Sequence, residues 1–160
     1  MTRGSKVELA RSVWTELLGY FFAHRERTFG AVAELGLTPG HMKAMYELSP
    51  TEGCSMSELA HTLHCDASNA TWLVDRLEER GLVERRPHPR DRRVKSVVLT
   101  PAGVAMKERL IERLSEPPSD LVALDRATLE QLSDALEHLP AHPPFWAPSP
   151  SRTFPVEDAV

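Results

Sequence analysis

The sequence predicts a mainly α-helical protein with one small β-hairpin. Apolar residues recur at steps of three and four over several segments, which is the spacing of one helix face. Helix-start signals precede these segments: Ser5 and Ser55 each stand three residues before a glutamate, and Thr38 and Thr100 each precede a proline. Residues 82–99 differ, because short apolar runs there flank a basic turn, a pattern typical of two paired strands.

About six helices are expected from these signals. Gly81 suits the position just after a helix end, and the pair Pro117 and Pro118 interrupts the helical pattern that precedes it. Residues 50–53 are expected to form a turn, and Cys54 is also expected in a turn. The expected helices cover residues 5–28, 38–48, 55–64, 66–80, 100–115 and 125–139.

The turn at residues 85–95 concentrates positive charge. It contains six Lys and Arg residues and one acid, Asp91, whereas the whole chain has 19 Lys and Arg against 23 Asp and Glu. A net charge of −4 argues against indiscriminate nucleic-acid binding, but specific binding depends on where the charge lies. An amphipathic helix followed by a basic hairpin is how a winged helix contacts duplex DNA, with the helix in the major groove and the hairpin at the minor groove. The pattern therefore indicates a winged helix-turn-helix protein whose partner is double-stranded DNA.

Composition narrows the class of protein further. With 160 residues, 41% of them apolar, the chain is long enough for one domain with a modest core. Its apolar runs fall short of the ~18 residues of a membrane span, so no membrane partner is expected. The N-terminal region lacks the uncharged segment of a signal peptide, and two cysteines cannot build a disulfide framework, so the cytoplasm is the expected location. No catalytic residue, metal or cofactor is expected, because no paired acid and base, nucleophile elbow or phosphate-binding glycine loop occurs.

Several strings of the sequence together resemble the MarR family of bacterial transcriptional regulators. They are Ser57–Ala60, Thr71–Glu78, Gly81–Arg85, Asp91–Arg93 and Leu99–Gly103. The similarity extends over about residues 7–139, and the stretch from Leu73 to Gly103 is its specific part. It implies a homodimer with the first and last helices interlaced at the interface. It also implies repression of nearby genes, relieved when a small anionic or phenolic inducer, an oxidant or a metal is sensed.

This organisation predicts four regions and a symmetric target. Residues 1–35 are expected to form an N-terminal dimerisation helix, residues 36–100 the DNA-binding domain, residues 101–140 the C-terminal dimerisation helices, and residues 141–160 a proline-rich tail. A protein with two-fold symmetry prefers an inverted-repeat operator with half-sites about one DNA turn apart.

The segment 66–80 is the expected recognition helix. Its apolar residues fall on one side at 100° per residue, which leaves polar residues and one tryptophan on the other. The N-terminal half of such a helix meets base edges, where Asn can pair with adenine and Thr can touch a thymine methyl group. Arg76 is placed better for a phosphate. Trp72 could alternatively pack under the hairpin or against a second chain. The candidate contacts are Ser68, Asn69, Thr71, Trp72 and Arg76.

The hairpin, or wing, supplies the second set of candidate contacts. Arg92 and Arg93 are expected near its tip, where a guanidinium can enter the narrow minor groove of A·T-rich DNA. The resemblance implies that Asp91 and Arg93 form the family's Asp-x-Arg motif, in which the acid orients the arginine. Phosphate contacts are expected from Arg85, Arg86, Arg90 and Lys95.

An inducer pocket is expected between the dimerisation helices and the winged domain. Its candidate lining is Trp14, Leu18, His41, Met42 and Met45, although methionine and aromatic residues at helical spacing are more often plain core.

Three alternatives remain open at the level of sequence. One is a winged-helix module that binds protein rather than DNA. Another is a metal- or redox-sensing regulator that uses His61, His64 and Cys65, which lie at helical spacing i, i+3 and i+4. The last is a metalloenzyme built on the same three residues, although a fourth ligand is not evident.

Overall fold

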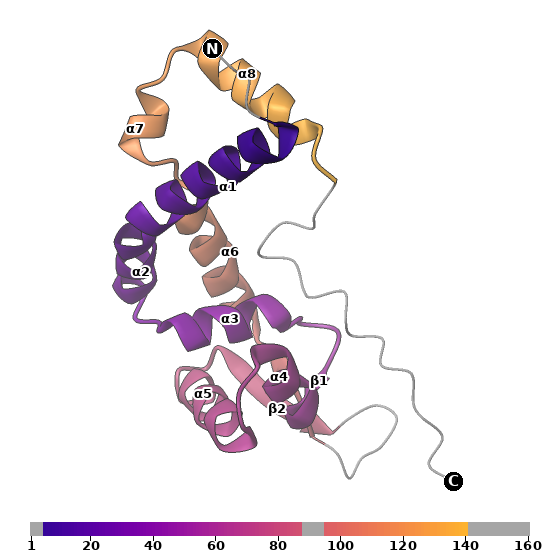
Figure 1. Cartoon of the computed structure of the whole chain (residues 1–160). Coiled ribbons are helices and arrows are strands. Elements are labelled where there is room, and N and C mark those ends of the chain that lie inside the picture. Colours follow the sequence, from indigo (N-terminus) through magenta and orange to yellow (C-terminus); the bar gives the residue numbers. More distant parts are fainter. Residues whose placement is uncertain (1–4, 88–94, 141–160) are drawn as a thin grey trace, which may run out of the picture.

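The structure is a computed structural model that describes residues 5–87 and 95–140, and it confirms the expected fold class (Figure 1). Helices dominate, and the strands form one small antiparallel sheet. The elements in chain order are α1 (Lys6–Ala23), α2 (Arg25–Glu34), α3 (Pro39–Glu47), β1 (Cys54–Ser55), α4 (Met56–Leu63), α5 (Ala67–Glu79), β2 (Val83–Pro87), β3 (Lys95–Leu99), α6 (Pro101–Ser115), α7 (Ser119–Val122) and α8 (Arg126–Glu137).

Most helices begin where the sequence predicted, because their first turns are capped locally. The Ser5 hydroxyl accepts a hydrogen bond from the Glu8 amide at 3.2 Å, and the Glu8 carboxylate accepts one from the Ser5 amide. The same reciprocal box joins Ser55 to Glu58 at the start of α4. The Thr100 hydroxyl accepts from the Gly103 amide at 3.0 Å at the start of α6. These bonds satisfy amide groups that a helix terminus otherwise leaves without partners.

Three elements depart from the expectation. The helix expected over residues 5–28 is interrupted at His24, and α2 continues to Glu34. The short helix α7 follows Pro118, which accounts for part of the difference from six expected helices. Cys54 belongs to strand β1 and is buried, so the prediction that it lies in a turn is wrong. Short elements of this kind gain their stability from tertiary packing, and so leave little periodic signal in the sequence.

The sheet has the order β1-β3-β2, with all pairs antiparallel. Val97 of the central strand faces Cys54 on one side and Arg85 on the other. Gly81, at φ +68°, turns the chain from α5 into β2, as its position in the sequence predicted. Gly103 lies so close to β2 that an added Cβ atom would sit 1.9 Å from the Leu82 carbonyl oxygen. A larger residue there would push α6 away from the sheet.

The buried core lies at one end of the molecule, where α3, α4 and α5 pack with the sheet and with α6 (Figure 1). Helices α1, α7 and α8 lie at the other end, and none of them contains a buried residue. Large core side chains that are fully or almost fully buried include Val32, Met45, Leu48, Leu59, Val74, Leu77, Val83, Val97 and Leu110. No described helix has the length and apolar character needed to cross a lipid bilayer.

Candidate nucleic-acid interface

Helix α5 is positioned as the second helix of a helix-turn-helix pair with α4. His64 ends α4 in the left-handed conformation, at φ 53°, which makes the turn between the two helices tight. The Asp66 carboxylate then caps α5 by accepting a hydrogen bond from the Asn69 amide at 2.8 Å. The apolar stripe identified in the sequence is buried and holds α5 against the core; it consists of Ala70, Leu73, Val74 and Leu77.

All five expected recognition residues lie on exposed positions of α5. The Thr71 hydroxyl donates to the Ala67 carbonyl oxygen at 2.8 Å, which commits its proton within the helix but leaves its methyl group accessible. Asn69 borders a shallow depression together with Lys43 and His64. The structure therefore brings these residues onto one surface, and their contact with bases stays a prediction.

Trp72 is held on this surface by two neighbours. Its ring stacks on the His41 imidazole of α3, with the centroids 5.7 Å apart and the planes 14° from parallel. The Arg76 guanidinium lies 5.9 Å from the Trp72 ring centroid and also pairs with the Glu79 carboxylate at 2.8 Å. About half of the Trp72 surface, 48%, nevertheless remains exposed. An aromatic ring that is fixed on one side and open on the other is suited to contact a further molecule.

The Arg85 side chain of β2 lies against helix α5. Its guanidinium lies 2.6 Å from the Asp75 carboxylate and also pairs with the Glu78 carboxylate. The Glu78 side chain accepts from the Arg85 backbone amide as well, at 3.1 Å. Burial acts to lower the pKa of Arg85, but its bonds with Asp75 and Glu78 outweigh burial and raise that pKa. The phosphate contact expected of Arg85 would have to compete with two carboxylates, so this arginine primarily joins the wing to α5.

The remaining wing residues fall into two groups. Arg86 and Lys95 are exposed at the facing ends of β2 and β3, and Arg86 forms an ion pair with Glu84 beside it. Exposed pairs of this kind are weak and exchange readily for another anion. The other candidates of the wing tip, Arg90, Asp91, Arg92 and Arg93, lie outside the described residues.

Arg80 has a structural role that the sequence did not reveal. From the end of α5 its guanidinium donates to the carbonyl oxygens of Gly36, at 2.6 Å, and Leu35, at 3.0 Å. These bonds satisfy carbonyl groups at the end of α2 and fix α5 relative to it. The pairing joins residues far apart in the chain, so no local motif could have indicated it.

The five candidate pocket residues are distributed over two helices. Trp14 and Leu18 lie on α1, where Trp14 is 60% exposed. His41, Met42 and Met45 lie on α3, which Figure 1 shows at a different level of the molecule from α1. Met45 is fully buried in the core, and His41 is occupied by its stack with Trp72. The five residues thus come from two separate helices of one chain, and the pocket stays a prediction for the assembled protein.

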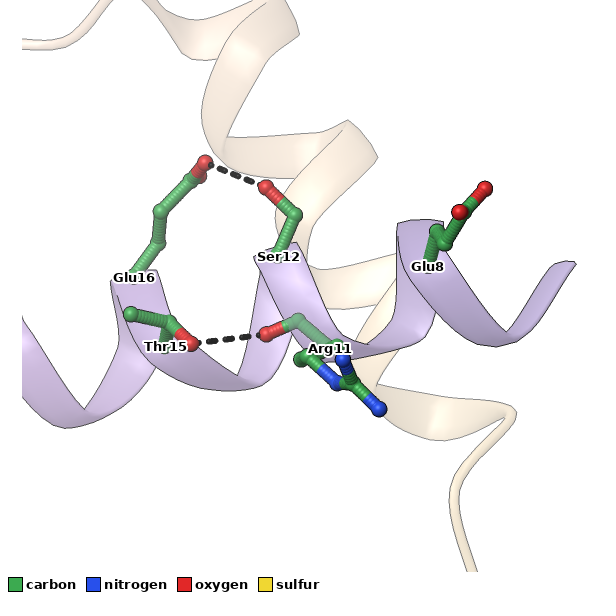
Figure 2. A pocket seen from close by; sticks show the side chains of 5 residues that line it. All are labelled: Glu8, Arg11, Ser12, Thr15 and Glu16. Carbon is green, nitrogen blue, oxygen red and sulfur yellow. Dashed lines mark hydrogen bonds between the residues drawn. The ribbon is translucent and has the colours of Figure 1, made fainter. Parts of the chain in front are cut away.

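A different depression lies along the polar side of α1 (Figure 2). It is lined by Glu8, Arg11, Ser12, Thr15 and Glu16. The polar groups there bond within the helix, as when the Thr15 hydroxyl donates to the Arg11 carbonyl at 2.9 Å and Ser12 bonds to Glu16 at 3.2 Å. Such contacts are those of a solvated helix face.

The alternative of a metal site at His61, His64 and Cys65 finds no support. The two imidazole rings lie 6.5 Å apart and tilted, and Cys65 is half-buried next to the core. Over residues 5–87 and 95–140, no group of three or more histidine, cysteine, aspartate or glutamate side chains could hold a metal ion.

Comparison with known proteins agrees with this geometry. A model described as the MarR family matches residues 37–95. Over 106 residues the chain is 32% identical to the multiple antibiotic resistance protein MarR of Salmonella typhimurium. The aligned region covers 63% of this chain and 74% of that protein. Over 100 residues it is 33% identical to a candidate transcriptional regulatory protein for the hcr operon of Thauera aromatica. The aligned region covers 62% of this chain and only 56% of that protein's length.

Solved structures show the same fold. The multiple antibiotic-resistance repressor from Listeria monocytogenes superposes with a TM-score of 0.70 at 19% identity, over 84% of this chain and 94% of that chain. The transcriptional repressor CouR, solved in complex with a 23-mer DNA duplex, superposes with a TM-score of 0.53 at 30% identity, over 78% of this chain and 92% of that chain. By the sequence match and the winged helix-turn-helix fold together, this chain belongs to the MarR family of transcriptional regulators.

Proposed function

We propose that the protein is a homodimeric transcriptional repressor that binds an inverted-repeat operator, with α5 in the major groove and the wing at the adjacent minor groove. One observation carries the proposal: the exposed face of α5 stands directly beside a wing whose sequence from residue 85 to residue 95 is strongly basic. The DNA-bound relative CouR, which is 30% identical, adds to this support.

Helix α5 and the wing have different roles in this proposal. Ser68, Asn69, Thr71 and Trp72 face the bases, and Arg76 lies one turn further on, within reach of a phosphate. Arg86, Arg90 and Lys95 contribute phosphate contacts, and Arg92 and Arg93 enter the minor groove, with Asp91 orienting Arg93. Arg85 keeps the wing against α5 through Asp75 and Glu78.

The dimer is proposed from the apolar surface at the opposite end of the molecule. Helix α1 exposes large apolar side chains, among them Trp14, Phe21 and Phe22, at 56–65% of their surface. Helix α8 likewise exposes Leu132 and Leu136. Soluble monomers rarely leave patches of this size uncovered, and a second copy of the same chain is the simplest complementary surface. This assigns residues 1–35 and 101–140 to dimerisation and residues 36–100 to DNA binding.

We further propose that a small-molecule inducer, bound where the dimerisation helices meet the winged domains, releases the DNA, and that the protein acts in the cytoplasm. The family resemblance supports both statements. Trp14 and Leu18 would then reach the half-buried Met42 through the assembled dimer, whereas His41 and Met45 are buried within the winged domain.

The test is direct binding to DNA. Duplexes are selected by the protein from fragments of the source genome, and fluorescence anisotropy then measures their affinity against salt concentration. We expect the logarithm of the affinity to fall linearly with the logarithm of salt, because phosphate contacts displace counterions. We also expect the selected duplexes to contain inverted repeats. Absence of duplex binding at low salt would contradict the function and would favour a module that binds protein instead.

A further inference from the structure

His41 occupies an unusual position for a histidine. It is the third residue of α3, where its Nδ1 atom accepts a hydrogen bond from the Thr38 amide at 3.2 Å and its own amide donates to the Thr38 hydroxyl at 3.2 Å. Glu or Gln usually completes such a capping box. The imidazole therefore performs the capping function of those side chains while it also provides an aromatic ring.

The same ring is 94% buried, and its other nitrogen has no hydrogen-bond partner among the residues that the structure describes. Because Nδ1 accepts a hydrogen bond, the neutral ring carries its proton on Nε2. A buried donor without a partner is unfavourable, so a glutamine would serve the helix start at least as well. What the imidazole adds is its flat face, and that face lies against Trp72.

Trp72 is correspondingly restrained by two neighbours, while 48% of its surface stays exposed. His41 covers one face of the indole at a near-parallel angle of 14°, and the Arg76 guanidinium lies 5.9 Å from the ring centroid. Trp72 lies among the exposed positions of α5, as do Ser68 and Thr71. Stacked rings hold each other's orientation, so His41 limits the directions in which the indole can point.

We propose that His41 is a positioning residue for sequence recognition: it fixes the Trp72 indole so that its apolar edge meets a thymine methyl group in the major groove. This inference rests on the proposed function and specifies one contact within it. His41 itself does not touch DNA. Among base edges in the major groove, the thymine methyl is the apolar feature that a tryptophan edge can recognise.

The test uses two variants that separate the ring from the helix cap. His41→Gln retains a side chain that can complete the capping box but removes the stacking face. His41→Phe retains a stacking face but removes the ring nitrogen that accepts from the Thr38 amide, which is the side-chain half of the capping box. Thermal unfolding of both variants reports any loss of the fold, and each is compared with wild type at equal folded fraction.

The first readout needs no DNA. In a background of Trp14→Phe and Trp146→Phe, Trp72 is the remaining tryptophan of the three in the chain, so acrylamide quenching of fluorescence reports its exposure. We expect His41→Gln to increase quenching and His41→Phe to leave it near the background value. Equal quenching in all three proteins would overturn the inference.

The second readout is discrimination between thymine and uracil. The probe is a duplex selected by the wild-type protein from a random pool, and each of its thymines is replaced in turn by uracil, which lacks the methyl group. We expect one position per half-site at which uracil weakens wild-type binding by about two- to tenfold, the range of one aromatic or base-edge contact. His41→Gln should lose that discrimination, and His41→Phe should keep it.

The outcomes also separate this inference from the proposed function. If the wild-type protein binds no duplex, the function itself fails, and the inference fails with it. If the wild-type protein binds DNA but His41→Gln discriminates thymine from uracil as well as wild type does, only the positioning role of His41 is overturned. Loss of discrimination in His41→Phe but not in His41→Gln would show that the helix cap, not the stack, is what discrimination requires, and would likewise overturn the positioning role.

Discussion

The Arg85 guanidinium of strand β2 lies 2.6 Å from the Asp75 carboxylate of helix α5, and this pair joins the wing to the helix beside it. Glu78, one turn further along α5, accepts from both the side chain and the backbone amide of Arg85. The Arg85 side chain is only 20% exposed, so the pair is partly shielded from water. The two surfaces that the proposed function assigns to the same DNA are thereby held at a defined relative orientation.

Replacing Arg85 with glutamine should lower the free energy of unfolding by about 1–3 kcal/mol, because it leaves two carboxylates close together without their charged partner. Denaturant unfolding measures this loss. The neighbouring variant Arg86→Gln is the matched control, since Arg86 is 56% exposed and its pair with Glu84 should contribute less than about 1 kcal/mol. Equal losses in the two variants would show that the bridge to α5 does not stabilise the wing.

Replacing Arg93 with alanine should weaken operator binding by more than ~1 kcal/mol, the scale of one good groove contact. Competition anisotropy with a selected duplex measures the change. Arg126→Ala removes the same charge from α8, where the side chain is 91% exposed and distant from the wing in the fold, and it should leave affinity nearly unchanged. If Arg93→Ala bound as tightly as wild type, the assignment of the wing tip to the minor groove would be wrong.

Replacing Phe21 with glutamate should convert the dimer to monomers, because it places a charge within the exposed apolar surface of α1. Sedimentation equilibrium measures the mass. Ser12→Glu, on the polar side of the same helix, serves as the control and should remain dimeric. Phe21→Glu should stay folded, since α1 contributes no buried residue to the core, and should lose its preference for inverted repeats over single half-sites. A dimeric Phe21→Glu protein would rule out α1 as the interface.

Acid should destabilise the protein through His41. Burial, and then the charge of Arg80, lower the pKa of this imidazole below its usual value of 6.5. The folded state therefore binds fewer protons than the unfolded state, so stability falls as the pH drops below about 6.5, until the folded pKa is reached. The difference in unfolding free energy between wild type and His41→Gln, measured across this range, isolates the effect. A difference that does not change with pH would show that the imidazole titrates normally in the folded protein.

Much of the architecture was predictable because it depends on neighbours in the chain. The capping boxes at Ser5 and Ser55 join residues three apart, and the turn at Gly81 needs only a residue that adopts positive φ easily. The buried stripe of α5 follows from helical periodicity, and therefore so does the exposed set from Ser68 to Arg76. The interruption at His24 was missed because no proline or glycine stands at that position, and strand β1 was missed because its two residues are too few to show an alternating pattern.

The sequence by itself determined the helix starts, the face of α5 that turns outward and the concentration of basic residues in the wing, since each depends on local hydrogen bonding, periodicity or charge. Only the tertiary structure decided that Arg85 bonds to α5 and that His41 supports Trp72. Both contacts join side chains from separate elements, and their partners are chosen by how helices and strands pack in space. Packing is a property of the folded chain as a whole, so it leaves no pattern within any one segment of the sequence.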